Sequence, residues 1–462
     1  MVIFFKRAIA VLALVCLIHS LTAKNLYISP NGDNNHNGSM SSPLATLQKA
    51  TSLAKPGDSI FIRGGFYQIR EPQHISCKGK SSQQILIMPY QGEEVVFDAL
   101  DLHTPVNPNH GRHYHGGAIH FEGAQYVILK NITVRNSRAV GIMAKGKETS
   151  HITIERCQSH GSYGSGIALW YADQSRVIEC VITGANDQSL RPNGAKVRRE
   201  APHEALTVAG ATNFEIAYNE LYNCFKEGID CKEVSANGII HSNYVYDLPR
   251  QGIYVDSWFG LLHDIEVFNN EVFQCEWGIT LSAEGKDSQM KNIKIHHNLI
   301  HNNRGSGILF GVWGHDQVRE NVEIYQNTVV NNGTSKHWAG VVGGIDIRSE
   351  NLKNVIIRHN IVAYNHGFDL AGALENHHEK AIKKELKVYK NLITDSTALP
   401  QTSGEFPDIK AINNGKNIIG EPAFIDAENH NFRLWPRSDA FKNYWEIVPG
   451  FYGRPAYTQK KD

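Results

Sequence analysis

Two short segments of the chain place ionisable residues at matching positions. Asp230 and Lys232 occupy the third and fifth places of GIDCK, and Tyr254 and Asp256 occupy the same places of GIYVD. Carboxylates beside an amine can exchange protons with a bound substrate, and carboxylate oxygens also bind Ca²⁺. If the two segments are neighbouring parallel strands, Asp256 lies about 4.8 Å from Lys232. Three ionisable groups then converge in one patch.

The two segments belong to a pattern in which a small residue is followed by alternating apolar residues. It recurs as GIMAK, GIALW, EALTV, GIDCK, GIYVD, GITLS, GILFG and GIDIR between residues 141 and 348. Successive side chains of a strand point to opposite faces, so the apolar places point inward and the others outward. The outward places are predicted to form two columns, Thr207–Asp230–Tyr254 and Ala209–Lys232–Asp256.

An Asn or Cys marks one point of each repeat, at steps of 23 to 39 residues. An Asn at every turn can bend the chain while its amide bonds to the Asn of the next coil. This pattern predicts an all-β parallel solenoid of about ten coils, with an N-terminal helical cap over residues 45–54. The marked residues are Asn131, Cys157, Cys180, Asn219, Asn243, Asn270, Asn298, Asn327, Asn360 and Asn391.

The N-terminus reads as a secretory signal over residues 1–23, because Lys6 and Arg7 precede an apolar run that ends in small residues. We therefore expect a secreted, periplasmic or cell-surface protein, with lipid attachment at Cys16 as the second choice. Residues 24–116 are predicted to form the cap and first coils, 117–395 the β-helix with its catalytic face, and 396–462 the closing coils. No later segment is long and apolar enough to span a membrane.

The chain has a formal net charge of zero and a pI of about 7.4, which favours no nucleic-acid partner. An acidic ligand must then be recognised locally, and the basic insertion with Arg198 and Arg199 suits an acidic polymer, although such runs are more often solvated loops. The mature chain has six cysteines without metal spacing. Cys157 and Cys180 fall on adjacent rungs, as a disulfide or as free stacked thiols. We expect a monomer.

The coil openings, the Asn ladder and the PGD turn at residues 56–58 together resemble the secreted right-handed parallel β-helix proteins of the pectate-lyase-like superfamily. The resemblance covers nearly all of the mature chain and implies the right-handed parallel β-helix. The superfamily includes lyases, glycoside hydrolases, esterases, epimerases and adhesins. In its lyases a Lys or Arg on this outward face removes a proton, and the matching residue is Lys232. The calcium-dependent lyases of the superfamily carry a dense aspartate cluster beside the base, whereas this chain has only the dispersed Glu204, Asp230 and Asp256.

We expect a polysaccharide lyase that cleaves a uronic-acid polymer, of the pectate or alginate type, by β-elimination. Lys232 is the predicted base, Tyr254 or His203 protonates the leaving oxygen, and Asp256 and Arg250 complete the catalytic group. The two aspartates alone would raise the pKa of Lys232. A Ca²⁺ ion held by Asp230, Asp256 and Glu204 is predicted to offset that effect. The predicted substrate-binding residues are Trp170, Tyr171, Arg198, Arg199, Trp258 and Arg348.

Two other functions fit the same residues. Asp230 and Asp256 lie diagonally across two rungs at roughly 8 Å, a separation that suits an inverting glycoside hydrolase. That enzyme needs both carboxylates and can spare Lys232. A carbohydrate-binding solenoid without turnover would keep its affinity after both Lys232 and Asp256 are replaced. The charged group can also be a surface ion-pair ladder, although the nearby aromatic residues and the basic insertion favour a functional site.

Overall fold

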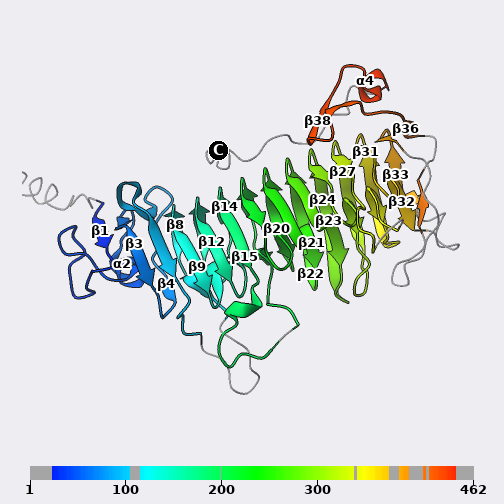
Figure 1. The fold of residues 1–462 in the computed structure, drawn as a ribbon. Helices are drawn as coiled ribbons and strands as arrows, with labels where there is room; N and C mark the ends of the chain where they lie inside the picture. Colours follow the sequence, from blue (N-terminus) through cyan, green and yellow to red (C-terminus); the bar gives the residue numbers. More distant parts are fainter. Residues whose placement is uncertain are drawn as a thin grey trace, which may run out of the picture.

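The chain folds into an elongated solenoid whose coils stack along one axis (Figure 1). In this computed structural model, almost every strand pairs in parallel with the equivalent strand of the next coil. The predicted all-β parallel β-helix is confirmed. The structure describes residues 23–104, 115–197, 199–337, 341–373, 384–394, 409–412 and 416–443.

One face of the solenoid is a parallel sheet of thirteen described strands. Alternate residues of each strand point into the core, as Ile265 and Val267 do with at most 1% of their surface exposed. This period of two is the one that the sequence predicted. In spatial order the strands are β1 (Asn25–Ile28), β2 (Ser59–Ile62), β5 (Ile85–Pro89), β8 (Gln125–Lys130), β11 (Ser150–Glu155), β14 (Arg176–Ile178), β17 (Glu215–Ala217), β20 (Ala236–His241), β22 (Gly260–Phe268), β24 (Ser288–His296), β27 (Arg319–Tyr325), β30 (Leu352–Arg358) and β33 (Leu386–Tyr389).

A second face carries the repeated coil openings and is called here the opening face. Its strands are parallel except for the last, which pairs antiparallel with its neighbour. In spatial order they are β4 (Gln73–Ile75), β7 (Gly117–Glu122), β10 (Val140–Lys145), β13 (Ile167–Trp170), β16 (Leu206–Ala209), β19 (Ile229–Lys232), β21 (Tyr244–Ser257), β23 (Glu271–Ala283), β26 (Ile308–Phe310), β29 (Ile345–Ile347), β32 (Leu370–Ala373) and β35 (Ile409–Ala411).

The third face joins the opening face because the long strands β21 and β23 belong to both. Its pairings are all parallel. The remaining strands of this face are β3 (Gly65–Gln68), β6 (Val95–Asp98), β9 (Thr133–Ser137), β12 (Gln158–Ser162), β15 (Val181–Ala185), β18 (Glu220–Tyr222), β25 (Leu299–His301), β28 (Thr328–Val330), β31 (Ile361–Ala363), β34 (Leu392–Ile393) and β36 (Ile418–Ile419).

The register of the opening face places the predicted columns as expected. Strand β16 pairs with β19, and β19 with β21, so that Lys232 lies between Ala209 and Asp256. The intervening residues Ile229 and Cys231 point inward and are fully buried. Strand parity alone therefore brings the ionisable side chains to one surface.

The Asn ladder is present from Asn219 to Asn417. Each amide nitrogen donates to the side-chain oxygen of the next Asn at 2.8 to 3.0 Å, and it also donates to a backbone carbonyl inside the coil. The buried turns thus keep their polar groups satisfied. A second, shorter ladder runs through Asn303, Asn332 and Asn365.

The bend at each turn comes from the residue before the ladder Asn. The residues that precede the ladder positions from Asn219 to Asn391 have φ between 54° and 58°, in the left-handed region, at a cost of about 1–2 kcal/mol for a residue with a side chain. Asn131 was assigned wrongly to the ladder. It is exposed with φ of 55° and makes the bend, whereas the buried Ile132 is level with Cys157.

Both ends of the described solenoid carry non-coil elements. Helix α2 (Leu47–Leu53), predicted over residues 45–54, is capped by Thr46, whose hydroxyl accepts a bond from the amide of Lys49 at 3.2 Å, and it packs on β1 and β4. The predicted closing strands form the antiparallel pair β37 (Phe424–Asp426) and β38 (Asn431–Leu434). The other elements are the 3₁₀ turns η1 (Tyr90–Gly92) and η2 (Gln188–Leu190) and helix α4 (Asp439–Asn443).

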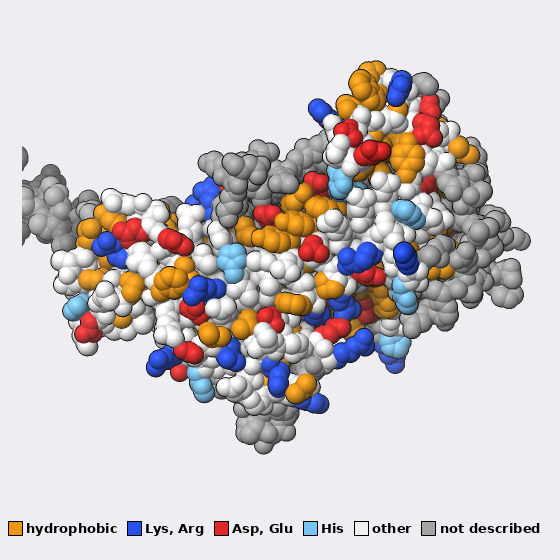
Figure 2. Space-filling view, in the orientation of Figure 1, with side chains coloured by type: hydrophobic (Ala, Val, Ile, Leu, Met, Phe, Trp, Pro, Cys, Tyr) orange, Lys and Arg blue, Asp and Glu red, His pale blue; other side chains and the backbone are white. Residues whose placement is uncertain are grey.

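The six cysteines of the described residues are buried and free, and they include Cys157 and Cys180, so these two are stacked thiols and not a disulfide. The predicted signal lies almost wholly outside the described residues. Within the described residues, no helix is long and apolar enough to cross a membrane. Figure 2 shows acidic and basic side chains interspersed over one side of the molecule, in keeping with a net charge of zero.

Candidate active site

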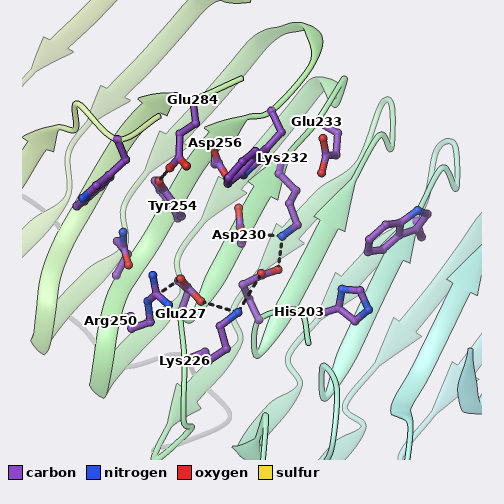
Figure 3. A pocket seen from close by; sticks show the side chains of 15 residues that line it. His203, Lys226, Glu227, Asp230, Lys232, Glu233, Arg250, Tyr254, Asp256 and Glu284 are labelled. Atoms are coloured by element: carbon purple, nitrogen blue, oxygen red, sulfur yellow. Dashed lines mark hydrogen bonds and ion pairs between the residues drawn. The ribbon is translucent and has the colours of Figure 1, made fainter. Parts of the chain in front are cut away.

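A cleft of about 650 Å³ opens on the opening face, over the rungs of β13, β16, β19, β21 and β23 (Figure 3). Trp170 lies at one end, and Trp313, which follows β26, lies toward the other. The lining combines many charged groups with aromatic rings, as sugar-binding clefts require. It consists of Trp170, His203, Glu204, Lys226, Glu227, Asp230, Lys232, Glu233, Arg250, Gln251, Tyr254, Asp256, Trp258, Glu284 and Trp313.

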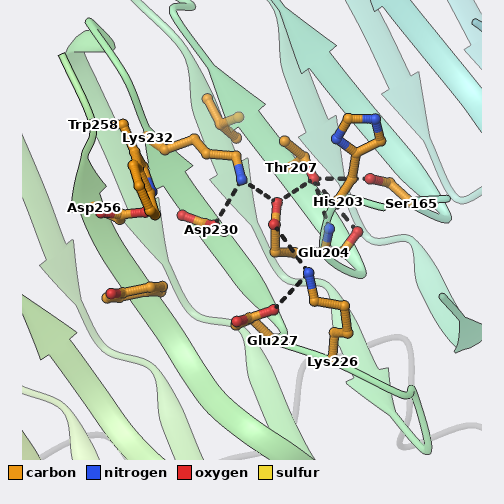
Figure 4. A network of polar contacts seen from close by, with 12 residues as sticks. Ser165, His203, Glu204, Thr207, Lys226, Glu227, Asp230, Lys232, Asp256 and Trp258 are labelled. Carbon is orange, nitrogen blue, oxygen red and sulfur yellow. Dashed lines mark hydrogen bonds and ion pairs between the residues drawn. The ribbon is translucent and has the colours of Figure 1, made fainter. Parts of the chain in front are cut away.

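Lys232 is at the centre of a polar network (Figure 4). Its Nζ lies 2.7 Å from Oε2 of Glu204 and 3.2 Å from Oδ2 of Asp230. The same Glu204 oxygen accepts a bond of 2.9 Å from the Thr207 hydroxyl. Both carboxylates are at least 95% buried, and Lys232 is 9% exposed. The amine is therefore fixed by two anions and faces the cleft.

These contacts separate the pKa values of the three groups. Burial alone would lower the pKa of Lys232, but the charges of Asp230 and Glu204 outweigh it and hold that pKa well above its usual value. Burial would raise the pKa of Glu204, yet Lys232 and Lys226 bring it to about 2. Burial raises the pKa of Asp230 well above its usual range. Glu204 is thus held as an anion beside the Lys232 ammonium, while Asp230 binds a proton more readily than an ordinary aspartate.

Glu227 links two more cations at the edge of the cleft. Its carboxylate lies 3.6 Å from Nζ of Lys226 and 2.8 Å from Nε of Arg250. Arg250 also binds Glu200 of the basic insertion at 2.7 Å. Arg250 therefore connects the insertion to the floor of the cleft.

Asp256 and Tyr254 project from β21 and take different partners. Oδ2 of Asp256 accepts a bond of 2.6 Å from Nε1 of Trp258, while its Oδ1 has no hydrogen-bond partner among the described residues. Burial and then the charge of Glu284 raise the pKa of Asp256 well above its usual range. The Tyr254 hydroxyl donates to Glu284. Asp256 therefore favours a proton that faces the cleft, whereas the proton of Tyr254 is already engaged.

His203 lies in the cleft as predicted, among other rings. Its centroid is 5.0 Å from that of Trp170 and 4.8 Å from that of His115. Burial is the main cause that lowers the pKa of His203 well below its usual value. The imidazole is therefore neutral, and it contributes to an aromatic wall beside Trp170.

Several predicted substrate-binding residues lie elsewhere. Tyr171 and the exposed Arg199 are not part of the cleft lining, and Arg198 lies outside the described residues. Arg348 is only 1% exposed, and its Nε binds Asp346 at 2.7 Å while another nitrogen donates to the Val341 carbonyl. Arg348 makes an internal ion pair in place of a substrate contact, because its guanidinium is bonded to Asp346 and to the Val341 carbonyl.

The predicted calcium ligands do not fit a Ca²⁺ ion in this arrangement. Calcium takes six to eight oxygens at about 2.3–2.6 Å. The oxygens of Glu204 face Lys232, Thr207 and Lys226 instead. In the described part of the chain, no group of three or more His, Cys, Asp or Glu residues is placed to hold a metal. Only the free oxygens of Asp230 and Asp256 remain as donors within the predicted set.

The sequence reasoning missed six residues of the lining. Glu227 and Gln251 each precede a coil-opening glycine, as Glu204 precedes Ala205, so they form a column of their own. Glu284 follows Thr280 and Ser282 at intervals of two residues, so it points outward with them, but it lies beyond the end of the GITLS segment. Glu227, Gln251 and Glu284 are therefore predictable from their spacing. The missed residues are Lys226, Glu227, Glu233, Gln251, Glu284 and Trp313.

Two curated proteins resemble the chain. One is an uncharacterised protein, YwoF, of Bacillus subtilis, with 26% identity over 90% of this chain and 92% of that protein. The other is pectate lyase PEL9 of Emericella nidulans, with 25% identity over 46% of this chain and 51% of the lyase. The second match therefore spans about half of each protein.

Solved structures with a similar architecture include pectate lyase Pel9A, with a TM-score of 0.43, 14% identity, and 74% and 76% of the two chains covered. A glycoside hydrolase has a TM-score of 0.48 and 11% identity over 73% of this chain and 93% of its own.

Two family models match the sequence. A Pel9A-like right-handed β-helix region matches residues 26–195, and a general right-handed β-helix region matches residues 117–292. The second of these spans most of the rungs that carry the cleft. With the parallel coils described above, these matches confirm the predicted fold and its hand. The chain is a right-handed parallel β-helix protein, and its residues 26–195 are similar to the Pel9A-like β-helix region.

Proposed function

We propose that the chain is an exported polysaccharide lyase, which cleaves a uronic-acid-containing polymer in this cleft by β-elimination with Lys232 as the base. The observation that carries the proposal is the position of Lys232, an amine fixed at the centre of a cleft on the outward face of a β-helix. The Pel9A-like family model and the relative named as a pectate lyase support the same class.

Elimination begins when a base removes the proton from the carbon next to the sugar carboxylate. Lys232 can accept that proton only as a neutral amine, and the charges of Asp230 and Glu204 favour its ammonium form. At pH values below its pKa, the neutral fraction of Lys232 increases about tenfold for each unit by which the pH is raised. We therefore expect a rate that rises toward alkaline pH for as long as the acid of the reaction keeps its proton.

The substrate carboxylate needs a positive partner while charge develops on the adjacent carbon. Lys226 and Arg250 lie at the edge of the cleft and both contact the carboxylate of Glu227, while Lys226 also contacts Glu204 and Arg250 also binds Glu200. A uronate that enters there can take over part of that bonding. These two cations are the proposed carboxylate-binding groups.

The leaving oxygen needs a proton as the glycosidic bond breaks. Asp256 suits this role better than Tyr254 or His203, because its raised pKa favours the protonated form and its Oδ1 is free of hydrogen-bond partners in the described structure. The Tyr254 hydroxyl donates to Glu284, and the His203 imidazole is neutral. Asp256 is the proposed acid, with Trp258 holding its other oxygen.

Glycoside hydrolysis is the second candidate, and the divergent carboxyl pKa values favour it. Asp256 favours a proton, whereas the pKa of Glu204 is about 2, so these two could act as acid and base. The pair predicted from the sequence, Asp230 and Asp256, lacks such a contrast because burial raises both pKa values.

Product chemistry distinguishes the two reactions. Elimination leaves a conjugated double bond that absorbs ultraviolet light, whereas hydrolysis yields new reducing ends without absorbance. Lys232→Ala should abolish the absorbance, and Lys291→Ala, which removes an amine from the thirteen-stranded sheet, should not change it. New reducing ends without ultraviolet absorbance would contradict elimination and support glycoside hydrolysis.

A further inference from the structure

The cleft has two ends of different charge. At the balanced end, defined by Glu204, Lys226, Glu227, Asp230, Lys232 and Arg250, three carboxylates meet three cations in a chain of ion pairs. At the anionic end the Glu284 carboxylate lies beside the Asp256 carboxyl group, and among the described residues no lysine or arginine lies within 4.0 Å of either group. Figure 3 shows these two carboxylates beyond Lys232, on the side away from His203.

Aromatic rings accompany the anionic end. Trp258 is 51% exposed, and its Nε1 is held by Asp256. Trp313 packs edge-on against Tyr254 with centroids 6.2 Å apart. Flat rings suit the apolar face of a sugar, and carboxylates accept bonds from its hydroxyl groups.

Asp256 supplies an independent sign that a ligand group belongs at this end. It is 2% exposed and lines the cleft, yet its Oδ1 has no hydrogen-bond partner in the described structure. Buried polar atoms are nearly always paired. A sugar hydroxyl could pair with this oxygen, while a sugar carboxylate there would face the charge of Glu284.

We infer that the cleft takes a uronate at its balanced end and a neutral sugar at its anionic end, so that the substrate is a polymer in which uronic acids alternate with neutral sugars. The inference rests on the proposed function and narrows its substrate class. A homopolymer of uronates would place a second carboxylate at the end of the cleft that holds Glu284. Repulsion between that carboxylate and the charge of Glu284 should lower affinity by about tenfold or more.

Binding tests the inference separately from turnover. The Lys232→Arg variant keeps the positive charge, and calorimetry at neutral pH can compare its affinity for an alternating uronate–neutral tetrasaccharide and for an all-uronate tetrasaccharide. We expect the alternating one to bind about tenfold more tightly. Equal or tighter binding of the all-uronate ligand would overturn the inference.

The source of the selectivity is tested by Glu284→Gln in the same background. This substitution keeps the shape and removes the charge, so affinity for the all-uronate ligand should increase about tenfold while that for the alternating ligand changes less than threefold. Glu320→Gln, which removes a charge from β27 on another face, should change neither. Selectivity that survives Glu284→Gln unchanged would overturn the inference.

The wild-type chain separates this inference from the function on which it rests. Equal ultraviolet absorbance from both kinds of polymer would support the lyase function and overturn the inference that the substrate alternates uronates with neutral sugars. Selective binding without absorbance from any polymer would support the inference about the sugars and contradict the lyase function.

Discussion

Glu204→Gln removes the carboxylate closest to the proposed base while preserving its shape. The lost contact joins Oε2 of Glu204 to Nζ of Lys232 at 2.7 Å in a buried site. At an effective dielectric constant of about 20, charges at that distance interact by about 6 kcal/mol, which is an upper bound. Opposite charges at close range typically change a pKa by about one to three. The Lys232 pKa should decrease by that amount.

The assay is the pH dependence of kcat/KM, followed by the ultraviolet absorbance of the product. In Glu204→Gln the alkaline rise should begin about one to three pH units lower than in the wild type. Asp230→Asn should move it less, because Asp230 is 3.2 Å from the amine and favours its own proton. Glu320→Gln, which removes a carboxylate from β27 on another face, is the control. An unchanged profile in Glu204→Gln would refute the role of Lys232 as the titrating base.

Three further results are expected. Asn270→Ala should lower Tm and destabilise the fold by about 2–4 kcal/mol, because Asn270 bonds to Asn298 and a carbonyl and accepts from Asn243; an unchanged Tm would contradict the ladder's role. Because the pKa of Glu204 is lowered to about 2, ionised Glu204 stabilises the fold above pH 4.5, and this stabilisation is lost as the pH falls toward 2. The free energy of unfolding, measured as a function of pH, should therefore decrease by about 3 kcal/mol over this range in the wild type and by less in Glu204→Gln. In calorimetry, Lys232→Ala should bind Ca²⁺ at least tenfold more tightly than the wild type, because the ammonium that competes for Glu204 is removed. Equal Ca²⁺ affinity of the two proteins would mean that any calcium binds elsewhere.

The architecture and the columns of the site could be predicted because strand parity depends on sequence spacing alone. Lys232 and Asp256 occupy the same place in consecutive openings, and parallel pairing makes them neighbours. Asn131 shows the limit of this reasoning. Both the bend and the ladder favour Asn, and only the register shows that Asn131 makes the bend while Ile132 points inward.

Side-chain partners could not be predicted, because they depend on the connections between strands. Arg348 holds an outward place like Asp256, yet its guanidinium is paired with Asp346 and donates to the Val341 carbonyl of the preceding connection. The calcium ion predicted from the sequence would lower the pKa of Lys232. In the structure Lys232 itself neutralises Glu204, because the position of a carboxylate in a column does not determine which of two nearby partners it takes.

Product absorbance is the most direct test of Lys232 as the base of an elimination. Purified wild type, Lys232→Ala and Lys291→Ala would be incubated at alkaline pH with polymers of uronic acids and of alternating uronate and neutral sugars. We expect rising ultraviolet absorbance from the wild type and Lys291→Ala and none from a folded Lys232→Ala. Undiminished absorbance from Lys232→Ala would contradict the role of this residue as the base.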